Sequence, residues 1–88
     1  MGTTIEVVLY TRSGCRLCEE VRGAIELLSG DFDFTLREVD IDSDPALRER
    51  YRLAIPVVFL NGEEAARGRI DSERIRRAME GTGRNRES

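Results

Sequence analysis

The two cysteines of this chain lie three positions apart, between a predicted strand and a predicted helix. Cys15 and Cys18 are its only cysteines. Residues 5–10 form a nearly continuous, β-branched apolar segment, which is typical of a buried strand. A cysteine at the start of the following helix lies where the helix dipole and free N–H groups favour a thiolate, so the pattern predicts a dithiol redox centre. The helix itself is predicted by apolar residues at spacings of three and four: Leu17, Val21, Ala24, Ile25 and Leu28.

The middle of the chain predicts a second strand and a short helix. Apolar and polar residues largely alternate over residues 32–39, as they do in a half-buried strand. Asp44 precedes Pro45, a pair that is typical of an N-cap followed by the first helical position. We expect this helix to end at about Arg50 or Tyr51.

The last part of the chain predicts a hairpin and a final helix. The apolar residues 57–60 indicate a third strand, and Asn61-Gly62 is typical of a type I′ hairpin turn. Residues 63–67 then return as an exposed edge strand. Asp71 or Ser72 is expected to cap the final helix, whose inner face carries apolar side chains.

These elements follow the order β-α-β-α-β-β-α. The first two strands should be parallel, joined by a right-handed crossover, whereas the hairpin makes the last two antiparallel. The fold class is therefore α/β, with a four-stranded mixed sheet and helices on both faces. We expect one domain over residues 1–80 and a flexible polar tail over residues 81–88.

The composition excludes several kinds of chemistry. The chain contains no histidine, which excludes Ser-His-Asp and Cys-His catalysis. Two cysteines cannot complete a tetrahedral metal site within one chain. Without an imidazole, a buried carboxylate or water would have to take up the protons of thiol chemistry.

The charge and the apolar content point to a soluble protein. The net charge of −3 argues against nucleic acid as a partner. No apolar segment approaches the roughly 20 residues that a membrane-spanning helix needs. The first residues do not resemble a signal peptide, so we expect a cytoplasmic protein with no membrane partner.

A Cys-X-X-Cys motif that opens the first helix, with a proline that opens the third strand, resembles the thioredoxin fold. Within that fold, the chain is similar to glutaredoxin-like proteins, and to a small bacterial subgroup of them. The resemblance covers about residues 5–80. It rests on residues 10–18 (Tyr-Thr-Arg-Ser-Gly-Cys-Arg-Leu-Cys), residues 55–59 (Ile-Pro-Val-Val-Phe), Gly68 and Asp71.

The resemblance implies a thiol–disulfide oxidoreductase that reduces protein disulfides or glutathione mixed disulfides. Cys15 would be the nucleophile and Cys18 the resolving thiol. Pro56 would be cis and face the cysteines, while Ile55 would offer backbone hydrogen bonds to the substrate. Glutathione is the expected co-substrate, and the oxidised pair would be reset by glutathione or by a thioredoxin or glutathione reductase system. No tightly bound cofactor and a monomeric state are expected.

The resemblance also implies a glutathione site. Arg12 matches the basic residue that contacts a glutathione carboxylate, and Gly68 and Asp71 match the loop near its γ-glutamyl end. Asp71 is equally well interpreted as a plain helix cap. In this loop Arg67 precedes Gly68 and Ile70 stands where the family usually has an acid.

Three other interpretations of the cysteines remain open. They could be inert structural residues of a helix. Two chains could supply four thiolates to zinc or to an iron–sulfur cluster, or glutathione could complete such a cluster between two protomers. The chain could also be a non-catalytic binding module that presents Ile55-Pro56 to a peptide. For Arg12 and Arg16, simple solvation of a surface arginine is the alternative to a role at the site.

Overall fold

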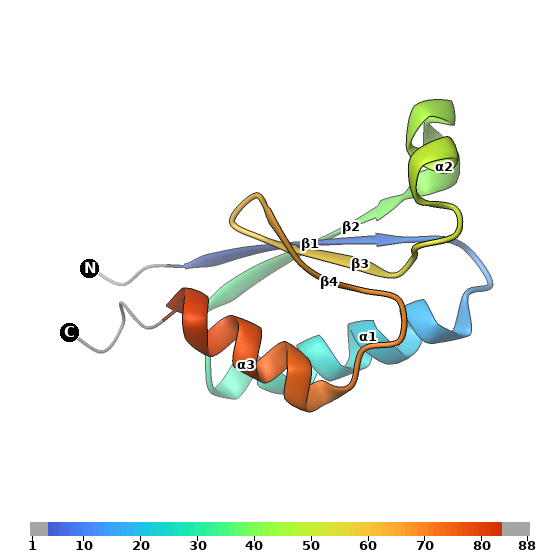
Figure 1. The fold of residues 1–88 in the computed structure, drawn as a ribbon. Coiled ribbons are helices and arrows are strands. Elements are labelled where there is room, and N and C mark those ends of the chain that lie inside the picture. Colours follow the sequence, from blue (N-terminus) through green and yellow to red (C-terminus); the bar gives the residue numbers. More distant parts are fainter. Residues whose placement is uncertain (1–3, 84–88) are drawn as a thin grey trace.

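The computed structural model describes residues 4–83. Its elements follow the predicted β-α-β-α-β-β-α order, with two short 3-10 helices between them (Figure 1). They are β1 (Ile5–Thr11), α1 (Arg16–Glu26), η1 (Leu27–Gly30), β2 (Phe34–Asp40), η2 (Ile41–Ser43), α2 (Pro45–Tyr51), β3 (Val57–Leu60), β4 (Glu63–Arg67) and α3 (Ser72–Gly83).

The four strands form one mixed sheet in the order β2-β1-β3-β4. As predicted, β1 and β2 are parallel and the β3–β4 hairpin is antiparallel; β1 and β3 are also antiparallel. In this register Thr11 lies opposite Asp40, Tyr10 opposite Val57, and Val57 opposite Arg67. The ends of β1, β2 and β4 and the start of β3 therefore meet at one edge of the sheet.

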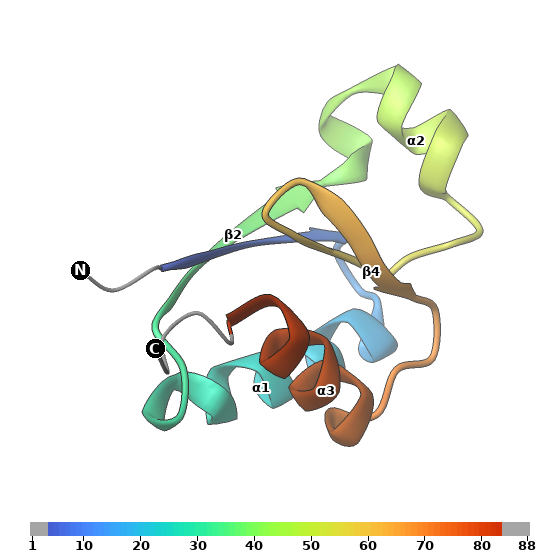
Figure 2. The same ribbon diagram turned by 60° about the vertical axis from the view of Figure 1, so that its left-hand side comes forward.

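Helices cover both faces of the sheet, but unequally. α1 and α3 lie side by side on one face, below the sheet in Figure 1, and Figure 2 shows the same arrangement from another side. They enclose the main core, because each helix turns one apolar stripe toward the sheet. Its buried members are Ile5, Val7, Leu9, Val21, Ile25, Leu28, Val58, Leu60, Ile75 and Met79.

A smaller cluster lies under α2, on the opposite face and near the end of β2 (Figure 2). It is built on Ile41, Tyr51 and Val57, all buried. The Tyr10 ring lies 4.8 Å from the Tyr51 ring and 5.3 Å from the Phe59 ring, measured between centroids. Both tyrosines therefore act as packing residues of this cluster.

The turns and caps have the expected chemistry. The carboxylate of Asp44 accepts from the Ala46 N–H at 2.9 Å, with proline in the first helical turn. Asn61 and Gly62 both have positive φ, at 51° and 86°, as a type I′ turn requires. These local signals act over two or three residues, which is why the sequence alone predicts them.

Two boundaries differ from the predictions. The second strand begins at Phe34 rather than at residue 32, because the Phe32 N–H donates to the Leu28 carbonyl and closes the turn after α1. α3 continues through Gly83, so it includes the first three residues of the predicted tail. A glycine costs a helix only about 1 kcal/mol, so Gly81 need not end it when the preceding turn is anchored in the core by Met79. The rest of the predicted tail lies outside the described residues.

Over residues 4–83, none of the helices combines the length and the apolar character that crossing a membrane requires.

Candidate functional site

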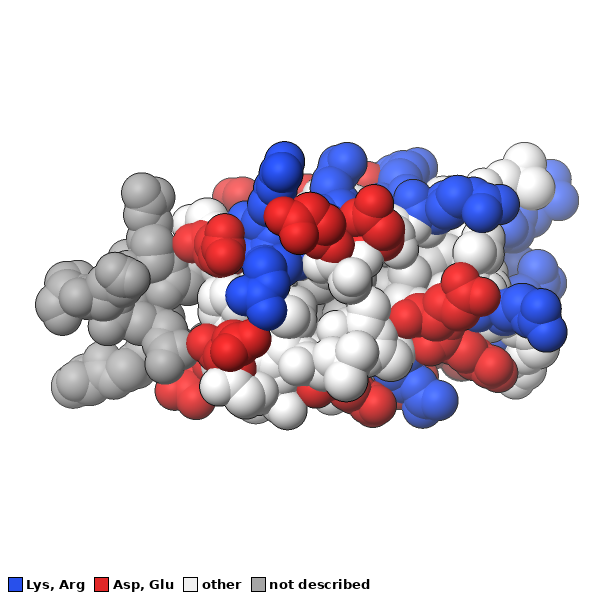
Figure 3. Space-filling view, turned by 90° about the horizontal axis from the view of Figure 1, so that it is seen from below, with Lys and Arg blue, Asp and Glu red and all other residues white. Residues whose placement is uncertain are grey.

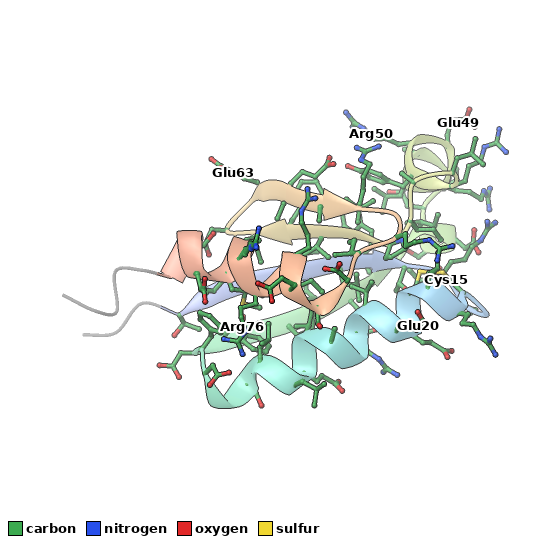
Figure 4. The ribbon with its side chains drawn as sticks, turned by 60° about the horizontal axis from the view of Figure 1, so that its bottom comes forward. Cys15, Glu20, Glu49, Arg50, Glu63 and Arg76 are labelled. Atoms are coloured by element: carbon green, nitrogen blue, oxygen red, sulfur yellow. A yellow bond between two sulfur atoms is a disulfide. The ribbon has the colours of Figure 1, made fainter. Side chains whose placement is uncertain are left out.

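The disulfide Cys15–Cys18 lies at the N-terminus of α1, at the end of the molecule away from the two termini (Figure 4). Gly14 turns the chain there with φ of 78°, a value that glycine adopts without strain. Cys15 is the N-cap of α1, and its Sγ accepts from the Cys18 N–H at 3.2 Å. Cys15 is half-buried, whereas Cys18 is only 1% exposed.

The two sulfurs differ in their electrostatic environment and in their accessibility. When the disulfide is reduced, the Cys18 N–H and the positive end of the helix dipole both favour negative charge on Cys15 Sγ. Cys15 is also the more accessible sulfur, so it is suited to attack an incoming disulfide, and the buried Cys18 is suited to resolve it.

The loop before β3 borders this end of the sheet. The Ile55–Pro56 peptide bond is cis, as the resemblance implied. The Gly68 N–H donates to the carbonyls of Pro56 at 2.7 Å and Ala54 at 3.1 Å, which ties the β4–α3 loop to the proline loop. The Ile55 N–H is already engaged, because it donates to the Tyr51 carbonyl at 3.1 Å. A substrate backbone would therefore meet the Ile55 carbonyl rather than its N–H.

Arg12 is held by an acidic residue that sequence reasoning did not connect with it. Its Nε donates to Asp42 Oδ2 at 2.9 Å, and Arg48 NH1 lies 3.9 Å from the other oxygen of the same carboxylate. The hydrogen bond to Asp42, together with its charge, raises the pKa of Arg12. Arg12 therefore ties the turn before α1 to η2, and a ligand carboxylate would have to share or displace Asp42.

A cavity of about 310 Å³ lies beside the disulfide, between the turn before α1 and the end of β2. Its lining includes one cysteine and five charged residues: Cys18, Arg12, Glu19, Arg22, Glu38 and Asp40. Only Cys18 and Arg12 were predicted as site residues. The predicted parallel pairing of β1 with β2 could have indicated Asp40 and Glu38. The carboxyl ends of adjacent parallel strands lie at the same edge of a sheet, which places the end of β2 beside the cysteines that follow β1.

Of the two expected routes for protons, a buried carboxylate or water, the first has no candidate in the described part of the chain, where no charged residue is buried. Carboxylates are instead present on the walls of that open cavity, where Glu38 also lies 3.6 Å from Arg22 NH1. Protons released or taken up at Cys18 can therefore reach these carboxylates or water. Over the same described residues, no group of three or more histidine, cysteine, aspartate or glutamate side chains is placed to hold a metal ion.

Asp71 is the N-cap of α3. Its Oδ1 accepts from the Arg74 N–H at 2.9 Å, and its carbonyl accepts from the Ile75 N–H at 3.3 Å. Asp71 also lines a shallow groove between α1 and the start of α3. The helix-cap interpretation is confirmed, whereas the role toward glutathione stays a prediction.

We expect Asp71→Ala to lower the free energy of unfolding by about 1 kcal/mol, because the cap is lost. Asp71→Asn is the matched control, since the amide oxygen can still cap the helix while the charge is gone. Urea unfolding followed by circular dichroism measures both. Equal stability of the alanine variant and the wild type would contradict the cap, and slower glutathione-dependent turnover in a stable asparagine variant would support a ligand role.

Known proteins share this arrangement. Residues 6–80 match the family model described as "Glutaredoxin-like domain (DUF836)". This chain belongs to that family. An uncharacterized protein of Mycobacterium tuberculosis is 33% identical to the glutaredoxin-like chain over 76 residues, which cover 81% of this chain and 78% of the relative.

Solved structures agree with the assignment. A protein from Nitrosomonas europaea has a TM-score of 0.74 and 29% identity, covering 88% of the glutaredoxin-like chain and 93% of its own. A protein from X. campestris has a TM-score of 0.73 and 29% identity, covering 85% of the glutaredoxin-like chain and 96% of its own. A mutant thioredoxin from Halobacterium salinarum has 20% identity and a TM-score of 0.69, and the match covers 92% of the glutaredoxin-like chain and 76% of the thioredoxin. It shows the shared thioredoxin fold.

Proposed function

We propose that this glutaredoxin-like protein is a thiol–disulfide oxidoreductase that reduces protein disulfides or glutathione mixed disulfides. The observation that carries the proposal is the unequal environment of one cysteine pair. Cys15 caps α1 and is partly accessible, and its Sγ accepts a hydrogen bond from the Cys18 N–H. Cys18 lies one turn further along the helix and is buried. A structural disulfide would need no such asymmetry, whereas dithiol exchange needs an accessible thiolate and a resolving thiol within reach.

The reaction begins with the reduced pair. The Cys15 thiolate attacks one sulfur of the substrate disulfide, forming a mixed disulfide, and the other substrate sulfur leaves as a thiolate. Cys18 loses its proton and attacks Cys15 Sγ, which releases the second substrate sulfur as a thiolate and closes the Cys15–Cys18 disulfide. Two electrons pass from the protein to the substrate, and the two substrate thiolates take up protons from solvent.

We further propose glutathione as the thiol that restores the dithiol, by two successive exchanges that leave glutathione disulfide. A thioredoxin or glutathione reductase system would then supply the electrons. Arg12 supports the assignment because it borders the cavity beside Cys18, and the Ile55 carbonyl could accept a backbone hydrogen bond from the bound tripeptide. Pro56 and Gly68 would shape the surface that it meets. Such a cycle needs a reducing compartment, which favours the cytoplasm.

The test is to trap the mixed disulfide. Cys18→Ser removes the resolving thiol, so we expect it to accumulate a covalent adduct on Cys15 with a peptide disulfide or with glutathione disulfide. Mass spectrometry under non-reducing conditions measures the adduct and locates it. Cys15→Ser is the matched control, because its remaining thiol, Cys18, is only 1% exposed. An adduct on Cys18, or none with either probe, would overturn the proposal.

A further inference from the structure

The end of the molecule that carries the disulfide is more basic than the rest of the chain. Three segments meet there, because the sheet register brings together the ends of β1, β2 and β4 and the start of β3: residues 11–18, 40–56 and 67–71. These segments hold seven of the fourteen arginines but only five of the seventeen acidic residues. In Figure 3, arginines form much of the outermost surface at the end opposite the grey termini.

Most of the acidic side chains at this end are already engaged by the protein. Asp42 pairs with Arg12, while the carboxylates of Asp40, Asp44 and Asp71 accept backbone N–H groups at the starts of η2, α2 and α3. These bonds hold the carboxylates near the backbone. Because the carboxylates are engaged there, part of the positive charge at this end has no acidic partner.

Four exposed arginines at this end make no ion pair with any residue in the described part of the chain: Arg16, Arg50, Arg52 and Arg69. Arg50 is engaged differently, because its guanidinium carbon lies 5.9 Å from the centre of the Tyr51 ring. Arg16 directly follows Cys15. Arg69 directly follows Gly68, whose N–H binds the proline loop, and Arg52 lies just before that loop. The neighbouring Arg67 differs, because two hydrogen bonds join its guanidinium to Glu64, at 2.6 and 2.8 Å.

An exposed apolar side chain accompanies these charges. Leu53 follows Arg52 at the turn before the proline loop, and it is 89% exposed. The other exposed large apolar residue of the described chain, Leu27, lies on η1, beyond the far end of α1. A leucine left in solvent beside unpaired arginines is the composition of a protein-binding surface rather than of a merely solvated one.

We propose that Arg16, Arg52, Leu53 and Arg69, here called the docking surface, bind substrate proteins through an acidic segment next to the cysteine that is exchanged. This inference rests on the proposed oxidoreductase function and names its substrate class. Electrostatic attraction would speed the encounter and select among disulfides, and Leu53 would add apolar contact. A protein is favoured over a nucleic acid, because the partner must bring a sulfur and the whole chain carries a net charge of −3.

Two synthetic disulfide-linked peptides test the proposal. They share one sequence, except that the residues flanking the cysteine are glutamates in one and lysines in the other. We expect the reduced protein to reduce the glutamate peptide faster by about tenfold at low ionic strength, at the low end of what electrostatic steering gives. The preference should shrink as salt is added, because exposed charges are screened over about 10 Å at 0.1 M. The neutral 2-hydroxyethyl disulfide serves as the reference substrate.

Charge reversal identifies the residues. Arg52→Glu/Arg69→Glu should abolish or invert the preference and leave reduction of the neutral disulfide unchanged, because neither residue takes part in the exchange. Arg37→Glu is the matched control. Arg37 is also exposed and free of ion pairs within the described residues, but it lies in the middle of β2, opposite Val8. Leu53→Ala should raise KM for both peptides, whereas Leu27→Ala should not.

The outcomes separate the two proposals. If the neutral disulfide is not reduced at all, the proposed function fails. If it is reduced, but the two peptides react equally or Arg37→Glu changes the preference as much as the double variant, the docking surface fails. Retention of the protein by a DNA duplex at the same salt concentration would overturn the assignment to a protein partner.

Discussion

Replacing Cys15 with serine is expected to reduce disulfide reduction to the uncatalysed rate. A serine hydroxyl is not ionised near neutral pH, and the remaining thiol, Cys18, is 1% exposed. The variant should still fold, because serine is a preferred N-cap and its oxygen can accept from the same Cys18 N–H as Sγ does. Turnover of 2-hydroxyethyl disulfide in the presence of glutathione and glutathione reductase measures the effect.

Cys15→Ala is the matched control for this experiment, since alanine removes both the thiol and the cap. We expect it to be as inactive as Cys15→Ser. Its free energy of unfolding should be about 1 kcal/mol lower than that of Cys15→Ser, with the reduced wild type as the common reference. Equal inactivity with unequal stability would separate the chemical role of the sulfur from its role in the helix. More than half of the wild-type rate in either variant would contradict the assignment of Cys15 as nucleophile.

Ile25→Ala is expected to cause the largest loss of stability. Ile25 is fully buried on the inner face of α1, in the main core between α1, α3 and the sheet. Truncating such a side chain typically costs about 2–5 kcal/mol, because apolar contact is lost and a cavity remains. That is a large fraction of the roughly 5–15 kcal/mol that stabilises a domain. Tm should fall by roughly 10 °C or more in a chain of this size.

Leu27→Ala provides the comparison for that loss. Leu27 is 81% exposed and lies only two positions further along the chain, in η1. Its truncation should change the free energy of unfolding by no more than about 0.5 kcal/mol, as surface substitutions usually do. Thermal and urea unfolding of the reduced proteins measure both variants. Similar losses in the two variants would show that α1 does not pack on the sheet through Ile25.

Much of the fold could be predicted because its signals are local. The apolar periodicity of residues 17–28 marks one face of α1 and continues into η1, and Asp44 before Pro45 starts α2. Asn61-Gly62 defines the hairpin through the backbone angles that its two residues can adopt. Where a boundary depended on packing, the prediction failed. Phe32 has a strand-like pattern but closes a turn on Leu28.

The candidate site also combines residues that are close in the sequence with residues that only the fold brings together. Cys15 and Cys18 were evident because three positions along a helix start suffice to bring their sulfurs together. The partner of Arg12 was not evident, because Asp42 is 30 residues away and meets it through the pairing of β1 with β2. Likewise, Asp40 and Glu38 join the cavity beside Cys18 through the register of that sheet.

The sequence by itself determined the order of the elements, the position of the dithiol at a helix start and the exclusion of histidine chemistry, since each depends on residue type and short spacing. The tertiary structure decided which charges are engaged and which are left over. Asp42 is drawn to Arg12 and Asp71 to the first turn of α3, while Arg16, Arg52 and Arg69 remain without ion pairs among the described residues. Charge pairing depends on distances through space, and only the packed sheet and its loops set those distances.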